Sequence, residues 1–389
     1  TPLGMPRYYF GDVGSGSAEF IIITQWVPGK GDGDWSAWVH ACQHVDLAAA
    51  PLSFWEDFMR ACGSFAGSCK AGRLDPQMPK SANTVAEPPS KDGSEEWLGV
   101  GDVDWAVQAA MVQEFVTTSG RRLFPSYTRT PEAMTSLRKC LLAGRNNAAV
   151  LAWWFQLRPD YLGVGLDRLD LDSLFLQPGV GSEEGDSGEG AGAEQRLCVK
   201  DWAGVSEGCL GQRLFAWLMC ANREVLQRSL WHLLEIFSEA WHASGGPKLD
   251  GTTLSVQFIM AVVVQCEQLV GQMEQLYKWC PKDQWSSIKS LSDERLCSCT
   301  STQGSLWRFV RCFVNVAVLI QHFGLADMVE RWMPEILSEH SIGRPMSRES
   351  PEAIYTVRRE GAPVFAEASS RSTLVARLPL RVYLFADGG

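Results

Sequence analysis

The sequence is poor in positive charge relative to negative charge. Its 35 Lys and Arg residues are outnumbered by 45 Asp and Glu residues, which gives a formal net charge of −10 at pH 7. This balance argues against non-specific binding to nucleic acids or to anionic membranes, because both require a surplus of cations. We therefore expect no nucleic-acid partner.

Long uninterrupted apolar runs are also missing. No stretch reaches the length of about eighteen apolar residues expected of a membrane-spanning helix. The best candidates are residues 258–266 and residues 309–323, and the second run is broken by Arg311 and Gln321. Both predict buried helices and no transmembrane span. The chain begins at Thr1 without the pattern of a targeting peptide, so we expect that such a peptide has been removed or that the sequence is a fragment.

Repeated CxxC spacing, which is typical of zinc sites, is absent as well. The twelve cysteines are scattered singly, apart from Cys297 and Cys299. Disulfide-rich scaffolds are usually far shorter than 389 residues. The pattern predicts buried free thiols in a reducing compartment, either the cytosol or the interior of an organelle.

Apolar and aromatic residues, in contrast, are plentiful. Hydrophobic residues make up 46% of the chain, and there are 16 Trp. This length and composition suit one large or two ordinary domains with a packed core. Several Trp follow helical spacing, so we expect them in the core or in an interface rather than in a ligand site.

Apolar residues at helical spacing dominate the chain from residue 51 onward. An early run at 8–10 and a second at 20–24, separated by the glycine-rich stretch 11–16, predict a β-hairpin. The tail at 371–385 reads as one or two strands. The predicted helices cover residues 51–74, 105–117, 131–155, 212–241, 254–280, 307–323 and 327–340, so the expected fold class is α+β and predominantly helical.

The most informative segment runs from Val164 to Gln177 (VGLDRLDLDSLFLQ), and residues 197–208 (LCVKDWAGVSEG) follow it. Together they resemble the catalytic core of the aminoglycoside phosphotransferase and choline-kinase-like families. In those families HGDLxLDNxxF precedes a hydrophobic strand that ends in Asp-Trp. The resemblance covers about residues 6–245. It implies a protein-kinase-like large lobe with a truncated small lobe.

The His-Gly-Asp of that pattern is missing. When residues 169–173 are aligned with LNLDN, Arg168 takes the place of the catalytic carboxylate and Ser173 that of the metal-binding Asn. Phosphoryl transfer needs a carboxylate to orient the hydroxyl and oxygen ligands for magnesium, and a guanidinium provides neither. A one-residue shift would instead make Asp167 the catalytic base and put Asp172 on magnesium, although it spoils the hydrophobic match.

Asp201 lies where the resemblance implies a second magnesium ligand. It is equally compatible with an ordinary strand-end carboxylate that caps a turn or pairs with Arg168. Between the two segments, residues 179–194 form an acidic low-complexity tract. This insert lengthens the family's usual short hairpin, and its negative charge would repel ATP.

The N-terminal hairpin resembles the one that leads into the interlobe hinge of these kinases. In the family, the phosphate-covering loop and the nucleotide-anchoring lysine precede this hairpin, whereas only a few residues precede it here. If a nucleotide binds, the resemblance implies contacts to its adenine edge from residues 24–27, which are Thr24, Gln25, Trp26 and Val27.

These observations predict a remnant of the small lobe and hinge at 1–30, a helical large lobe at 31–340, and a C-terminal extension with a strand-like tail at 341–389. The leading hypothesis is a non-catalytic pseudokinase without a cofactor, acting as a structural or accessory subunit with protein partners in a larger assembly. The alternative is an active kinase that uses ATP and Mg to phosphorylate choline, an aminoglycoside or a similar hydroxyl substrate. A third possibility is an inactive regulator that binds a nucleotide.

Overall fold

The computed structural model divides the chain into two compact units, Thr1–Ile336 and Leu337–Gly389. The structure describes residues 8–13, 20–24, 43–44, 47, 49–74, 105–166, 169–170, 174–178, 195–199, 205–301, 304–342, 353–356, 362–365, 374–378 and 383–386.

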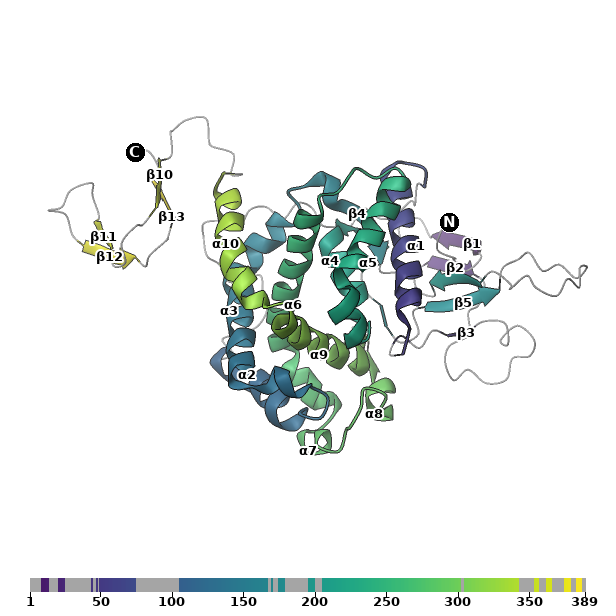
Figure 1. Ribbon diagram of the computed structural model, residues 1–389, viewed down its shortest axis with the longest axis horizontal. Helices are drawn as coiled ribbons and strands as arrows, with labels where there is room; N and C mark the ends of the chain where they lie inside the picture. The colour runs from purple at the N-terminus through teal and green to yellow at the C-terminus, as the bar shows by residue number, and fades with distance from the viewer. Residues whose placement is uncertain are drawn as a thin grey trace, which may run out of the picture. The chain divides into compact units, whose positions relative to one another are not determined.

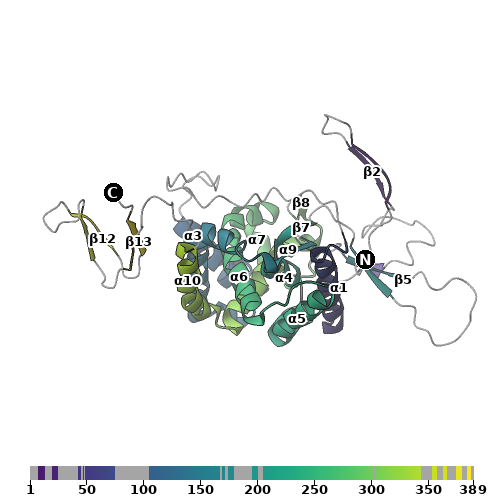
Figure 2. The ribbon, with the colours of Figure 1, turned by 90° about the horizontal axis from the view of Figure 1, so that it is seen from above.

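The first unit is built around a long central helix, α6 (Gly251–Trp279). It lies between α3 (Pro131–Trp154) on one side and the pair formed by α1 (Leu52–Lys70) and α5 (Arg223–Ala243) on the other (Figures 1 and 2). Contacts to α3, α4 (Leu210–Leu218), α5 and α9 (Leu306–His322) cover α6 on several faces. A helix surrounded in this way is expected to be apolar over most of its circumference.

The apolar character of α6 also makes it the one described helix that by itself is long and apolar enough to cross a membrane. Of its most apolar window, 61% is buried inside the fold. The helices α9 and α10 (Leu325–Ile342) pass the same test only as a pair, and that pair is bent by 83°. Packing against neighbouring helices accounts for the hydropathy of α6, because core helices have the same composition.

Polar side chains begin the main helices where the sequence offers Asx or Ser/Thr residues. Thr130, Asn222, Asp250 and Ser305 each accept a hydrogen bond from the backbone N–H three residues later. These bonds satisfy N–H groups that lack an intrahelical acceptor. At the other end of α5, Gly245 has φ of +99°, so the predicted helix stop at this glycine is confirmed.

The remaining helical elements of the first unit are shorter. They are α2 (Trp105–Glu114), which continues into a π-helical turn (Phe115–Ser119), the 3₁₀ turns Ser126–Arg129 and Pro159–Tyr161, α7 (Lys282–Trp285) and α8 (Glu294–Cys297).

Antiparallel pairing joins all described strands. The predicted N-terminal hairpin is confirmed by β1 (Tyr8–Val13) and β2 (Phe20–Thr24). A three-stranded sheet has the order β3 (Gln43–His44), β5 (Leu174–Pro178) and β6 (Gln195–Val199), and a separate pair joins β4 (Leu162–Leu166) to β7 (Val205–Cys209). A minimal pair, β8 (Thr300–Ser301) and β9 (Gly304–Ser305), precedes α9.

In the second unit, β10 (Ala353–Thr356) pairs with β13 (Tyr383–Ala386), and β11 (Ala362–Phe365) pairs with β12 (Leu374–Leu378). The strands predicted in the tail are therefore present. The two earlier strands of this unit were not predicted from the sequence.

The prediction of one helix over residues 212–241 is wrong. The chain leaves α4 at Met219 and starts α5 after Asn222. The carbonyls of Met219 and Ala221 accept hydrogen bonds from the buried amide of Asn315, at 2.8 and 2.9 Å, instead of from a continuing helix. Because the bonds come from α9, which is distant in sequence, the periodicity of 212–241 contains no sign of the break.

The core is rich in tryptophan, as the sequence predicts. The five most buried Trp are Trp55, Trp217, Trp241, Trp285 and Trp307, each with its side chain essentially inaccessible. Among the eleven cysteines that the structure describes, none forms a disulfide, as predicted, and seven of them are buried whereas four are partly exposed. The apolar and aromatic excess of the sequence is thus used largely inside the first unit.

Candidate functional site

Two nested strand pairs frame the segments that resemble the phosphotransferase core. Leu166, the last residue of β4, pairs with Val205, the first residue of β7. Leu174, the first residue of β5, pairs with Val199, the last residue of β6. The residues that bound segments 167–173 and 200–204 are thus paired with each other. The members of the two pairs lie 39 and 25 positions apart along the chain.

Buried side chains from α4 and from the turn after it donate hydrogen bonds to the backbone at the start of the first segment. The indole Nε1 of Trp217 donates to the carbonyl of Leu166 at 2.8 Å, and the thiol of Cys220 donates to the carbonyl of Leu169 at 3.5 Å. Burial raises the pKa of the Cys220 thiol to about 12, so the sulfur keeps the proton that it donates.

Close packing of buried side chains against the backbone of β4 explains its two glycines. A Cβ at Gly165 would lie 2.6 Å from Cζ2 of Trp217, and one at Gly163 would lie 2.6 Å from a methyl carbon of Leu210 and 2.8 Å from the Trp241 ring. Real Cβ atoms do not approach other heavy atoms this closely. The glycines of the GVG sequence therefore leave room for the rings of Trp217 and Trp241 to pack against the strand.

One carboxylate of this segment has a structural partner. Asp170 accepts a hydrogen bond from the backbone N–H of Ser305 at 2.8 Å and another from the Ser305 hydroxyl. The same hydroxyl accepts a hydrogen bond from the N–H of Arg308 and so caps α9. Asp170 thereby ties the segment to the start of α9.

The sequence-predicted site residues lie outside the described residues. This holds for the candidate catalytic Asp167, for the candidate metal ligands Asp172 and Asp201, and for Arg168 and Ser173.

The same is true of three of the four residues proposed for the adenine edge, Gln25, Trp26 and Val27. The fourth, Thr24, is the last residue of β2, where its backbone pairs with Tyr8. Among the residues that the structure does describe, no group of three or more His, Cys, Asp or Glu side chains could hold a metal ion.

A second site, which the sequence analysis did not predict, is a pocket of about 480 Å³ in the helical part of the first unit. We call it the basic pocket. Its floor is one face of α9, formed by Arg311, Val314 and Asn315, all of them buried. Its rim carries the exposed side chains Arg122, Arg223, Glu224 and Lys289.

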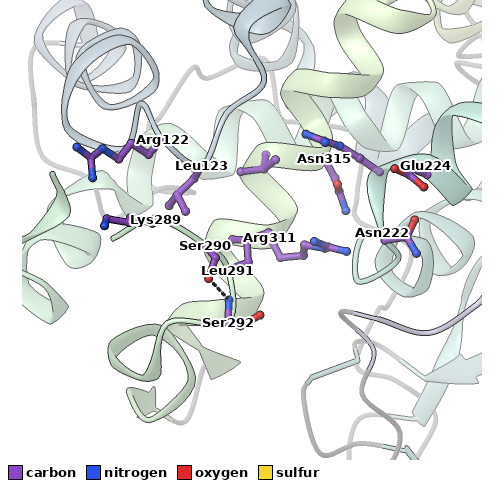
Figure 3. A pocket seen from close by; sticks show the side chains of 12 residues that line it. Arg122, Leu123, Asn222, Glu224, Lys289, Ser290, Leu291, Ser292, Arg311 and Asn315 are labelled. Carbon is purple, nitrogen blue, oxygen red and sulfur yellow. Dashed lines mark hydrogen bonds between the residues drawn. The ribbon is translucent and has the colours of Figure 1, made fainter. Parts of the chain in front are cut away.

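Elements distant in sequence build the basic pocket. Arg122 comes from the turn after the π-helix, Arg223 and Glu224 from the first turn of α5, and Lys289 from the loop between α7 and α8. In the view of Figure 3, Arg122 and Lys289 line one side, and the Arg311 guanidinium points toward Asn222 on the other.

The floor is held by polar contacts to the break between α4 and α5. Nε of Arg311 donates to the carbonyl of Ala221 at 3.1 Å, and the amide nitrogen of Asn315 donates to the same carbonyl and to that of Met219. The amide oxygen of Asn315 is buried and has no hydrogen-bond donor among the described residues. A signal for this site existed in the sequence, because Arg311 and Asn315, four residues apart, interrupt the otherwise apolar stretch 309–320.

Comparison with protein-family models, with curated proteins and with solved structures finds no match for this chain.

Proposed function

We propose that this chain is a non-catalytic, phosphotransferase-like protein that serves as a structural or accessory subunit of a larger assembly. The observation that carries the proposal is the replacement of the catalytic carboxylate by Arg168 in the alignment with the better hydrophobic match. A guanidinium neither accepts the proton of an attacking hydroxyl nor binds magnesium.

Two described features support this proposal. The nested pairs β4–β7 and β5–β6 suit the resemblance, since it implies a hairpin between the catalytic-loop and metal-aspartate equivalents. Asp170, in the segment equivalent to the catalytic loop, forms hydrogen bonds with the start of α9, which is a structural role.

The second unit supports a role in an assembly. Its described strands form only two-stranded ladders, and a two-stranded ladder is marginally stable in isolation and leaves strand edges open. Such edges can be completed by a strand of a partner protein. The Trp excess gives no comparable support, because the five most buried Trp lie in the core of the first unit.

Isolation of the tagged full-length chain from its native source tests the subunit role. The proposal predicts that stoichiometric protein partners co-purify and that the chain elutes in a complex larger than its own 43.0 kDa. A monodisperse monomer that retains no partner under mild extraction would contradict it.

The alternative is an active small-molecule kinase that uses ATP and magnesium. The paired flanks Leu166–Val205 and Leu174–Val199 favour it, because they bring the boundaries of the two acidic segments together. In that case Asp167 would be the base, and Asp172 and Asp201 would bind magnesium. Transfer of the γ-phosphate to choline or an aminoglycoside, lost in Asp167→Asn, would establish this alternative.

A further inference from the structure

The basic pocket concentrates positive charge in a protein that is acidic overall. Among the described residues, its lining includes the four cationic side chains Arg122, Arg223, Lys289 and Arg311 and one carboxylate, that of Glu224. The whole chain has a net charge of −10. A local surplus of cations of this kind favours an anionic ligand.

The rim cations are not used to neutralise neighbouring carboxylates. Within the part of the chain that the structure describes, Arg122, Arg223 and Lys289 form no salt bridge, although other surface cations do, such as Lys139 with Glu330 at 2.7 Å. Their side chains are exposed at the mouth of the pocket, above a floor that contains the buried guanidinium of Arg311. An anion that enters would meet rim cations from three separate elements.

The size and polar groups of the pocket restrict the ligand further. A volume of about 480 Å³ is in the range of small-molecule sites rather than of surfaces that bind macromolecules. The first turn of the 21-residue helix α5 contributes to the rim, and helix N-termini favour phosphate groups through their N–H groups. The hydroxyls of Ser290 and Ser292 add donors suited to phosphate oxygens.

We propose that the basic pocket binds a small metabolite that carries two or more phosphate charges. Arg122 and Lys289 contact its phosphate groups at one side, and Arg311 supports them from the floor. This site is separate from the segments around Asp167 and Asp201 and does not depend on the proposed function.

Calorimetric titration of the full chain with sodium pyrophosphate, in a magnesium-free buffer of low ionic strength, tests this proposal. We expect saturable binding that weakens as salt is added, because the contacts are between charges near the surface. Inorganic phosphate should bind more weakly than pyrophosphate. The double variant Arg122→Ala/Lys289→Ala should bind about tenfold more weakly or worse, as expected for the loss of two charged contacts. Both positions are exposed, so the variant should remain folded, which circular dichroism checks.

Two controls locate the binding. Lys278→Ala removes one exposed cation from α6, outside the pocket, and should leave the affinity unchanged. Asp201→Ala should also bind pyrophosphate like the parent chain. Absence of saturable heat, equal affinity in the double variant, loss of affinity in Asp201→Ala, or citrate binding as tight as that of pyrophosphate would each overturn the proposal.

Discussion

The carboxylate of Asp170 accepts hydrogen bonds from both the backbone N–H and the hydroxyl of Ser305, a residue 135 positions further along the chain. Ser305 in turn caps α9 through the N–H of Arg308. The segment that resembles a catalytic loop is thereby connected to the helix that forms the floor of the basic pocket.

Removal of either partner should destabilise the first unit. Ser305→Ala loses the helix cap and the bond to Asp170, and we expect a loss of about 1–3 kcal/mol in the free energy of unfolding. Urea unfolding of Ser305→Ala, Asp170→Asn and the double variant should show a coupling of about 1 kcal/mol.

The matched control for this cycle uses the cap of another helix. Thr130 caps α3 through the N–H of Ala133, away from Asp170 in the hydrogen-bond network. The effects of Thr130→Ala and Asp170→Asn should add within about 0.5 kcal/mol. If the effects of Ser305→Ala and Asp170→Asn also add, the hydrogen bond between these two side chains contributes nothing to stability.

A methyl group at Gly165 should be costly, because its Cβ would lie 2.6 Å from Trp217. Overpacking of this kind destabilises by about 1–3 kcal/mol. Gly271 is the control, since a Cβ there meets nothing within 4 Å and the residue lies inside α6. Gly271→Ala should stabilise by about 0.5–1 kcal/mol through helix propensity. Thermal unfolding of both variants measures the contrast, and equal shifts would refute this account of the glycine.

Most helices could be predicted from the sequence, whereas the break between α4 and α5 and the basic pocket could not. Periodicity predicted most helices, because burial of one face imposes a repeat that is visible in the letters. The break at Met219–Asn222 was missed because its carbonyls are satisfied by Arg311 and Asn315 from a distant helix. The basic pocket was missed for a related reason, since its cations come from separate elements and no local motif joins them.

A pH dependence is expected from Glu114, at the junction of α2 and the π-helical turn. Partial burial acts to raise its pKa, but hydrogen bonds from Tyr277 and Ser119 and the ammonium of Lys282 together outweigh this effect. The net result is a pKa below the ordinary value of 4.5. The stabilisation is therefore present above pH 4.5 and is lost as the pH falls through the lower pKa of the folded state.

Melting temperatures of Glu114→Gln and of the parent chain, measured across this range, test the assignment. The variant should be less stable at pH 7, and the difference should shrink as the pH falls below 4.5 and the parent carboxylate becomes protonated. Glu274→Gln, an exposed carboxylate on α6, should follow the parent at every pH. A deficit in Glu114→Gln that stays unchanged however far the pH is lowered below 4.5 would refute the assignment.

The buried thiols should resist alkylation in the folded chain. Burial raises the pKa of Cys140 to about 12 and has the same effect on Cys209, so little thiolate, the reactive form, is present at pH 8. Mass spectrometry after a short iodoacetamide pulse should find these residues unmodified in buffer and modified in denaturant. Cys299, which is only partly buried, serves as the internal reference. Labelling of Cys140 at the rate of Cys299 would contradict the packing.

Deletion of residues 343–389, which include all described strands of the second unit, tests whether this unit binds the partner proteins. The truncated chain keeps all helices through α10, so its circular dichroism and melting temperature should match those of the full chain within a few degrees. It should, however, lose its co-purifying partners, because the open strand edges of the second unit are removed. Retention of all partners by the truncated chain would assign the contact to the first unit instead.

The central claim is that the phosphotransferase-like segments neither bind Mg-ATP nor transfer its phosphate, and Mg-ATP calorimetry tests it most directly. The titration should use the Arg122→Ala/Lys289→Ala background, so that phosphate groups bind only weakly in the basic pocket. We expect no saturable heat that is lost on Asp201→Ala. Saturable Mg-ATP binding that disappears on Asp201→Ala would show that the phosphotransferase-like segments hold a nucleotide, and would contradict the claim.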